Sequence, residues 1–258
     1  MRIFSISLIF LIFFSCANTD KDNIKSKSEI TLLSEKVNDN PNDVIPLLNR
    51  AKYNLAKNKY ESALFDLKQC ILIDSSNNEC NYLAAFSYFE ISKYDKTKTD
   101  YGNYALECIK KSINYDKNNY LAYALYGEIN IAYGRYKEAI EMFNKSLLIE
   151  YNQEKVHHLL GYAFKKLGQF EASINCFQNS INVNPDFIEP YIEMGLIYQS
   201  KNDTLTTTFY KNALKIDSSN TIVLYNLALY YQNNLLYNEA LSTYNDLLTY
   251  DSFNANTH

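Results

Sequence analysis

The chain has 258 residues, 47% of them hydrophobic, with 25 basic and 29 acidic side chains and a net charge of −4. It contains only 6 glycines and 4 prolines, which argues against a sandwich or barrel built from many tight turns and favours helices joined by short connections. A nucleic-acid backbone requires a clustered basic surface, and the sequence has no basic run, so we expect no nucleic-acid partner.

The first 27 residues predict an export signal followed by a linker. The apolar stretch over residues 3–14 would span only about 18 Å as a helix, too short for a bilayer core of about 30 Å, so a removed signal peptide is the better interpretation. The sequence Phe-Phe-Ser-Cys, ending at Cys16, resembles the lipobox of bacterial lipoproteins, although Phe13 replaces the more usual leucine. The resemblance implies that residues 1–15 are removed and that Cys16 is the lipid attachment residue. An ordinary secretory signal and an uncleaved anchor are the alternatives.

Residues 16–27 are polar and have no apolar period, which predicts a flexible tether between the membrane and the fold. Two or more acyl chains on the cysteine would make the attachment stable. Ala17 follows Cys16, whereas an aspartate there would resemble the inner-membrane retention signal of such lipoproteins. We therefore expect a lipid-anchored protein of the bacterial cell envelope, at the outer membrane (periplasmic or surface face) rather than at the inner membrane.

Residues 28–258 predict one array of helical repeats, started by a lone helix over Ile30–Val37. A small residue of each first helix recurs at intervals of 34, 42, 34, 34 and 33 residues, at Ala51, Ala85, Gly127, Gly161, Gly195 and Ala228. The matching small residues of the second helices are Ala63, Ala105, Ala139, Ser173, Thr206 and Ala240. We expect the paired helices to approach most closely at these positions. Large residues should then fill the gap to the next repeat, at Leu67, Ile109, Phe143, Phe177, Tyr210 and Tyr244.

The spacing resembles that of the tetratricopeptide repeat, in segments such as YNLAKNKYESAL, IAYGRYKEAI, LGYAFKKLGQFEASI and LYYQNNLLYNEAL. An aromatic residue stands three positions before the small residue of the second helix, at Tyr60, Tyr136, Phe170 and Tyr237. The resemblance covers residues 30–254 and implies an all-α fold. Its architecture is a right-handed α-solenoid of about six helix-turn-helix repeats, over residues 44–77, 78–119, 120–153, 154–187, 188–220 and 221–254.

Two repeats depart from the pattern. The second carries eight extra residues around Ser92 to Asn103, which we expect to lengthen the turn between its helices as a solvated loop, with a partner contact as the alternative. The fifth is one residue short and places three threonines, 206–208, at the start of its second helix. Because β-branched residues lower helix propensity, we expect this repeat to be the weakest.

The resemblance implies that first-helix residues line a concave wall that binds an extended or helical peptide or protein segment. We expect this wall to be apolar and aromatic with few charges, and the alternative is that many of its rings pack on neighbouring helices. The inward-facing set is Leu48, Lys52, Tyr82, Phe86, Phe89, Glu128, Ile131, His158, Tyr162, Lys165, Ile192, Leu196, Gln199, Tyr225, Leu229 and Gln232.

The sequence offers no convergent catalytic set, so we expect no enzyme, no cofactor and no metal site. His157 and His158 are adjacent on a helix and point about 100° apart, so they cannot chelate one ion together, and His157 fits a packing position. The cysteines show no paired metal-ligand spacing. A disulfide between Cys70 and Cys80, which end and begin successive helices, is one alternative in an oxidising compartment.

We therefore expect a non-catalytic scaffold or adaptor, tethered to an envelope membrane, whose partners are other envelope proteins. The alternative is a surface or periplasmic lipoprotein that binds a ligand or glycan by stacking its aromatic rings. The last second helix should leave Tyr244, Leu247 and Leu248 uncovered. Solenoids need a polar cap at each end, so we expect this edge to be covered by self-association or by a partner, unless the chain is a truncated product.

Overall fold

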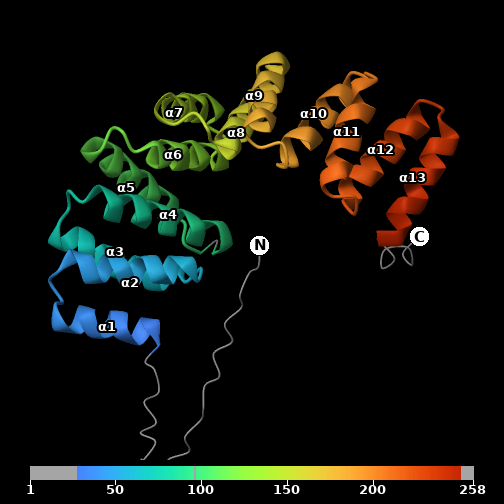
Figure 1. Ribbon diagram of the computed structural model, residues 1–258. Helices are drawn as coiled ribbons and strands as arrows, with labels where there is room; N and C mark the ends of the chain where they lie inside the picture. Colours follow the sequence, from blue (N-terminus) through green and yellow to red (C-terminus); the bar gives the residue numbers. More distant parts are fainter. Residues whose placement is uncertain (1–27, 96, 251–258) are drawn as a thin grey trace, which may run out of the picture.

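The computed structural model describes residues 28–95 and 97–250, and these residues form thirteen α-helices and no strand (Figure 1). The predicted all-α solenoid is therefore confirmed. The helices are α1 (Glu29–Asp39), α2 (Val44–Ala56), α3 (Tyr60–Ile73), α4 (Asn78–Tyr94), α5 (Tyr101–Tyr115), α6 (Tyr120–Ala132), α7 (Tyr136–Ile149), α8 (Glu154–Lys166), α9 (Phe170–Val183), α10 (Glu189–Ser200), α11 (Leu205–Ile216), α12 (Thr221–Asn233) and α13 (Tyr237–Tyr250).

Within each repeat the two helices approach most closely where the sequence places its small residues. A Cβ atom added to Gly127 would lie 2.4 Å from the ring of Phe143, and one added to Gly195 would lie 2.4 Å from the ring of Tyr210. Both rings are fully buried. The prediction that small residues permit this approach is confirmed, since even one methyl group would overlap the ring of the partner helix.

In five of the six repeats, the described turn between the two helices uses a left-handed backbone position. Gly134 and Gly168 take this position with φ of 70° and 74°, and Asn58 takes it with φ of 54°. Leu235 adopts the same conformation, with φ of 61°. Glycine and asparagine tolerate the left-handed region, whereas a leucine there is strained. The backbone strain at Leu235 therefore lowers the stability of the last turn.

Side-chain caps mark the turns between repeats. Asn77, Asn119 and Asn220 precede α4, α6 and α12, and the side-chain oxygen of each accepts a hydrogen bond from a backbone N–H of the first turn. Asp74 and Asp217 end the preceding helices, and their carboxylates accept hydrogen bonds from Ser76 and Ser219. The polar stretches that the sequence placed between repeats therefore end one helix and begin the next.

The hairpins follow one another around an open arch, from α1 to α13 (Figure 1). Each helix packs on its neighbours in sequence, and α4, α6, α8 and α10 also contact one another in turn. These first helices lie toward the inside of the arch, and α5, α7 and α9 lie toward its outside. The predicted lone helix, α1, packs on α2 and begins the array.

The insertion in the second repeat is only partly the loop that we expected. The helix α4 has 17 residues, whereas α2, α6, α8 and α12 have 13, so four of the added residues extend this helix by about one turn. The described residues between α4 and α5 are 95 and 97–100. The expectation of a loop from Ser92 was wrong because Ser92 to Tyr94 continue the helix, where the Ser92 hydroxyl donates to the Phe89 carbonyl oxygen.

The fifth repeat forms both of its helices despite its threonines. The helix α11 has 12 residues, against 14 in α3, α7 and α9. Thr206 is fully buried in the place of the usual alanine, and its hydroxyl donates to the carbonyl oxygen of Asp203 at 2.6 Å. The buried hydroxyl therefore has a hydrogen-bond partner within the first turn of α11. The one-residue deletion in this repeat shortens the helix but does not prevent it from forming.

At the last helix, the exposed surface is smaller than we expected. Tyr244 and Leu247 are half-buried, whereas Leu248 is 51% exposed. The signal peptide over residues 1–15, Cys16 and the tether over 16–27 lie outside the described residues, as do residues 251–258. Within the part of the chain that the structure describes, no helix has both the length and the apolar character needed to cross a membrane.

Candidate functional site

The predicted wall residues all lie on first helices, but they differ in how far they reach solvent. Lys52, Tyr225 and Gln232 are exposed, and Phe89 is buried, with 5% of its surface exposed. The other members are half-buried, namely Leu48, Tyr82, Phe86, Glu128, Ile131, His158, Tyr162, Lys165, Ile192, Leu196, Gln199 and Leu229. Most side chains of the predicted wall are therefore half-buried rather than fully exposed to solvent.

Two members of the wall bind tyrosines of their own repeats. The Tyr210 hydroxyl donates to the side-chain oxygen of Gln199 at 2.6 Å. The Tyr244 hydroxyl donates to the side-chain oxygen of Gln232 at 2.9 Å. These glutamines accept hydrogen bonds from the hydroxyls of the tyrosines that fill the fifth and sixth repeats. The two glutamine side chains therefore have a structural role.

The wall is more charged than we expected. Lys52 on α2 pairs with Glu79 on α4 at 2.7 Å, and Lys165 on α8 pairs with Glu193 on α10. Both pairs join consecutive first helices. Sequence reasoning missed Glu79 and Glu193 because an inter-repeat pair depends on how far one hairpin rotates against the next. The two pairs add Glu79 and Glu193 to the three charged residues that we expected on the wall.

Glu128 lies at the middle of this wall, on α6. It forms no hydrogen bond and no ion pair with any residue that the structure describes. Burial raises the pKa of the Glu128 carboxyl, Lys93 and Lys155 oppose that shift, and Glu90 adds to it. Lys93 is itself paired with Glu90 on α4 and lies 4.9 Å from the centre of the Phe89 ring. Glu128 is thus a half-buried carboxylate between cations that do not contact it.

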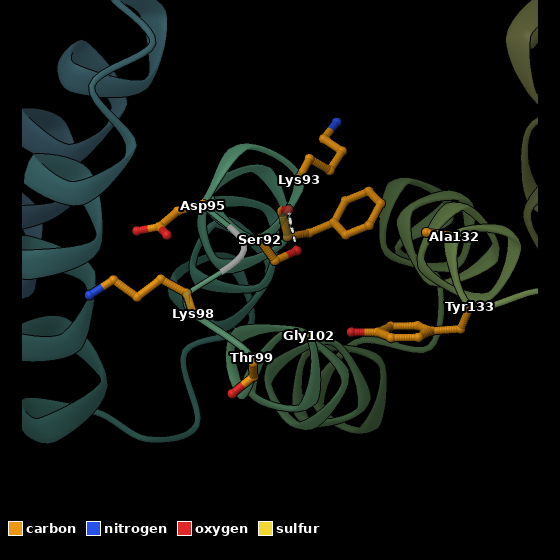
Figure 2. Close-up of a pocket in the computed structure, with 9 residues that line it drawn as sticks. Ser92, Lys93, Asp95, Lys98, Thr99, Gly102, Ala132 and Tyr133 are labelled. Atoms are coloured by element: carbon orange, nitrogen blue, oxygen red, sulfur yellow. Dashed lines mark hydrogen bonds between the residues drawn. The ribbon is translucent and has the colours of Figure 1, made fainter.

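A cavity of about 320 Å³ opens between the end of α4, the start of α5 and the end of α6 (Figure 2). Figure 2 shows the hydroxyl of Tyr133 pointing at Gly102, while the side chains of Asp95 and Lys98 point away from Tyr133. The lining residues are Phe89, Ser92, Lys93, Asp95, Lys98, Thr99, Gly102, Ala132 and Tyr133. The inserted residues of the second repeat therefore form one wall of this cavity.

The histidines serve packing. His157 is buried, and a nitrogen of its ring lies 3.0 Å from the carbonyl oxygen of Tyr151. His158 lies between the rings of Phe177 and Phe187, with centroids 5.6 and 5.5 Å away. Burial lowers the pKa of both imidazoles. The described residues contain no group of three or more histidine, cysteine or acidic side chains placed to hold a metal ion.

The four cysteines of the described chain are free thiols. Cys70 and Cys80 are fully buried, and their thiols interact with each other across α3 and α4. Cys70 also donates a weak hydrogen bond to the carbonyl oxygen of Val44 at 3.7 Å. The two residues that could form a disulfide are therefore neighbours, and in this structure they remain reduced.

The described residues form an α-solenoid whose fold matches that of solved tetratricopeptide-repeat proteins. Residues 161–202 match the model of the TPR repeat. The chain resembles the solved structure of PilF from Pseudomonas aeruginosa, at 17% identity and a TM-score of 0.66, over 82% of this chain and 96% of that one. It also resembles YrrB, described as a TPR protein with an unusual peptide-binding site, at 17% identity and a TM-score of 0.60, over 75% and 96%.

Curated relatives are longer proteins that share the repeats. BBS4 of the BBSome complex from Bos taurus is 30% identical over 122 residues, which is 47% of this chain and 23% of that protein. The TPR repeat-containing protein MJ1428 from Methanocaldococcus jannaschii is 27% identical over 195 residues, which is 70% of this chain and 32% of that protein. The chain thus spans about a quarter to a third of the length of these two relatives.

Proposed function

We propose that this protein is a non-catalytic scaffold that binds segments of other envelope proteins along the wall of α2, α4, α6, α8, α10 and α12. The observation that carries this proposal is that α4, α6, α8 and α10 contact one another in turn and lie toward the inside of the arch. A solenoid exposes its first helices along a continuous concave surface, which suits an extended segment of a partner. The likeness to YrrB, which is described by its peptide-binding site, supports the same use of the fold.

We further infer that a lipid on Cys16 holds this wall at a bacterial membrane. The supporting feature is the apolar stretch over residues 3–14, which ends at a small residue and Cys16. The test is metabolic labelling with a palmitate analogue, followed by fractionation of membranes. The wild type should carry label and sediment with membranes, and Cys16→Ser should lose the label. Labelling of Cys16→Ser equal to that of the wild type would exclude Cys16 as the lipid attachment residue.

Capture of partners tests the scaffold itself. The lipidated protein is cross-linked in envelopes, solubilised and purified, and its partners are quantified by mass spectrometry. The variant Tyr82→Ala/Phe86→Ala changes two half-buried wall residues, and Phe65→Ala/Leu72→Ala changes two exposed residues of α3 as a control. We expect the wall variant to lose partners that the α3 variant keeps. Equal capture by both variants would contradict binding at the wall.

A further inference from the structure

Two cysteines meet at the junction between the first and second repeats. Cys70 lies in the last turn of α3, and Cys80 lies in the first turn of α4. Both side chains are fully buried within one core cluster, and their thiols are in hydrogen-bonding contact with each other. The fold therefore brings together two sulfur atoms whose residues are separated by ten positions in the sequence.

The equivalent positions of the other four junctions hold small or compact side chains. Cys70 lies seven positions after the small residue of its second helix, and Cys80 lies five positions before the small residue of the next first helix. The equivalent residues are Ser112 and Ala122, Ser146 and Val156, Ser180 and Pro190, and Ala213 and Val223, all of them buried. Only the first junction has cysteine at both positions.

Hydrogen bonding alone does not account for a cysteine at position 70. At the equivalent positions, the hydroxyls of Ser146 and Ser180 donate to backbone carbonyl oxygens of their own repeats at 2.9 and 2.8 Å. The Cys70 thiol makes the corresponding contact with the carbonyl oxygen of Val44, but only at 3.7 Å. A thiol is the weaker donor, so a serine would serve this hydrogen bond better. The feature that distinguishes the position is the neighbouring thiol of Cys80.

The turn between the two cysteines is held by hydrogen bonds. The Asn81 side chain donates to the carbonyl oxygens of Ser75 and Asn77 at 3.1 and 2.8 Å. The Asn77 side chain accepts a hydrogen bond from the backbone N–H of Cys80 at 2.9 Å. A disulfide tolerates little backbone movement, so a fixed turn with thiols already in contact favours its formation.

We propose that Cys70 and Cys80 form a disulfide in the exported protein. This inference rests on the proposed function, since the bond requires the oxidising compartment outside the cytoplasm. The oxidant is a thiol oxidase that carries a reactive disulfide. One cysteine thiolate attacks that disulfide and forms a mixed disulfide, and the second thiolate then displaces the oxidase sulfur. The pair loses two electrons and two protons, and the oxidase is released with both of its cysteines reduced.

Burial determines when the bond forms and how long it lasts. Neither side chain reaches solvent in the folded chain. The oxidase must therefore act while α3 and α4 are still closing after export, and a reductant has no access to the bond once the core has formed. The disulfide is then a lasting link between two consecutive repeats. It ties α4 covalently to the first repeat, at the junction that the Lys52–Glu79 ion pair bridges on the wall.

The test counts free thiols of the full-length protein in bacterial envelopes. Cells are quenched with acid, and the protein is denatured and alkylated with a maleimide polymer that adds a mass resolvable on a gel to each free thiol. The chain has five cysteines, and Cys16 is blocked when it carries lipid. We expect two additions before reduction, at Cys108 and Cys176, and four after reduction. Peptide mapping of the unreduced protein should show Cys70 linked to Cys80.

Matched double variants assign the bond. Cys70→Ser/Cys80→Ala introduces residues found at the equivalent positions of other junctions, so the fold should be retained, with two additions before and after reduction. Cys108→Ser/Cys176→Ser also removes two cysteines and should give no addition before reduction and two after it. In thermal unfolding, the oxidised wild type should melt about 5 °C higher than the reduced wild type. Cys70→Ser/Cys80→Ala should show no such difference.

Four additions before reduction would overturn the inference, as would a bond from Cys70 or Cys80 to another cysteine. Refolding of the reduced protein with oxidised glutathione then shows which part failed. A Cys70–Cys80 bond formed in vitro would mean that the geometry is right and that the protein meets no oxidising compartment, which contradicts the proposed export. No bond in vitro would mean that the two thiols are wrongly placed, and it would leave the proposed export untouched.

The same count separates the disulfide from the lipid. Three additions before reduction and five after it would support the bond between Cys70 and Cys80, and they would contradict a lipid on Cys16. Four additions before and after reduction would support the lipid and overturn the bond.

Discussion

Arg50 on α2 and Asp66 on α3 form a two-point ion pair, in which Nε donates to Oδ2 at 2.9 Å and Nη2 donates to Oδ1 at 2.7 Å. The Asp66 side chain is only 2% exposed. Arg50 also donates to the Ser34 hydroxyl at 3.3 Å, so one guanidinium connects α1, α2 and α3. The pair therefore joins the first helix of the array to the first repeat.

Arg50→Ala should destabilise this end of the solenoid strongly. It leaves the Asp66 carboxylate buried without its partner, a change that costs about 3–5 kcal/mol in the free energy of unfolding. Urea unfolding measures the loss. Lys145→Ala removes one partner of the exposed Lys145–Glu141 pair and should cost less than about 1 kcal/mol. A similar loss in both variants would show that the buried Arg50–Asp66 pair contributes no more to the free energy of unfolding than an exposed pair.

Leu235→Gly should stabilise the protein. Leu235 has φ of 61° and is 70% exposed, so its side chain contributes little packing while its backbone is strained. Relief of the left-handed strain, roughly 1–2 kcal/mol, exceeds the entropy that glycine adds to the unfolded chain, and a net gain of about 0.5–1 kcal/mol is expected. The reverse change at the equivalent position, Gly134→Leu, should lower the free energy of unfolding. A loss of stability in Leu235→Gly would contradict the argument from strain.

Gly127→Ala and Gly102→Ala are the same substitution in two helices, and they should differ in effect. At Gly127 the new methyl group would meet the buried ring of Phe143 at 2.4 Å, which should cost about 1–3 kcal/mol. At Gly102 it would meet the far end of Tyr133, a part-exposed side chain that can rotate away. Thermal unfolding should therefore show a large loss for Gly127→Ala and little for Gly102→Ala. Comparable losses would mean that Tyr133 cannot move.

Glu128→Gln should raise stability at neutral pH and lose that advantage in acid. Burial raises the pKa of the Glu128 carboxyl above the ordinary value of 4.5, so the ionised form is disfavoured in the folded chain. The groups that face it are Glu90 and Lys93 of α4 and Lys155 of α8. The penalty of ionisation is absent below the unfolded pKa and grows as pH rises through the folded pKa.

The measurement for this prediction is urea unfolding of the wild type and Glu128→Gln between pH 4 and pH 8. The difference in free energy of unfolding should favour the glutamine variant at pH 7 and shrink towards zero as the pH approaches 4. Glu141→Gln breaks the exposed ion pair with Lys145, so it should show only a weak trend of the opposite sign. A wild type that is more stable than Glu128→Gln at pH 7 would indicate a stabilising contact of the carboxylate.

The repeat architecture could be predicted because its signals are local. Gly127 and Phe143 reveal their contact through a spacing that recurs in other repeats, and capping residues such as Asn119 mark where a helix begins. The inserted residues could not be placed so well. Ser92 to Tyr94 have no strong helix breaker, and only the packed structure shows that the helix continues through them.

The candidate site was predictable in part. Glu128 belonged to the expected wall, whereas the cavity is lined by Gly102, which interrupts the aromatic position shared by Tyr60 and Tyr136. That interruption was visible in the spacing. The pairing of Lys52 with Glu79 was not visible, because it requires the rotation between hairpins, which no local pattern encodes.

Each hairpin packs mainly on its neighbours in the sequence, so the arch can bend by small rotations between consecutive hairpins. Within the described residues, no helices far apart in the sequence make extensive contacts, so a small rotation at each junction adds up to a large change in the distance between α1 and α13. The cavity lies at one such junction, between the second and third repeats. Its lining residues come from α4, α5 and α6, so a rotation at this junction would change the shape of the cavity together with the curvature of the arch.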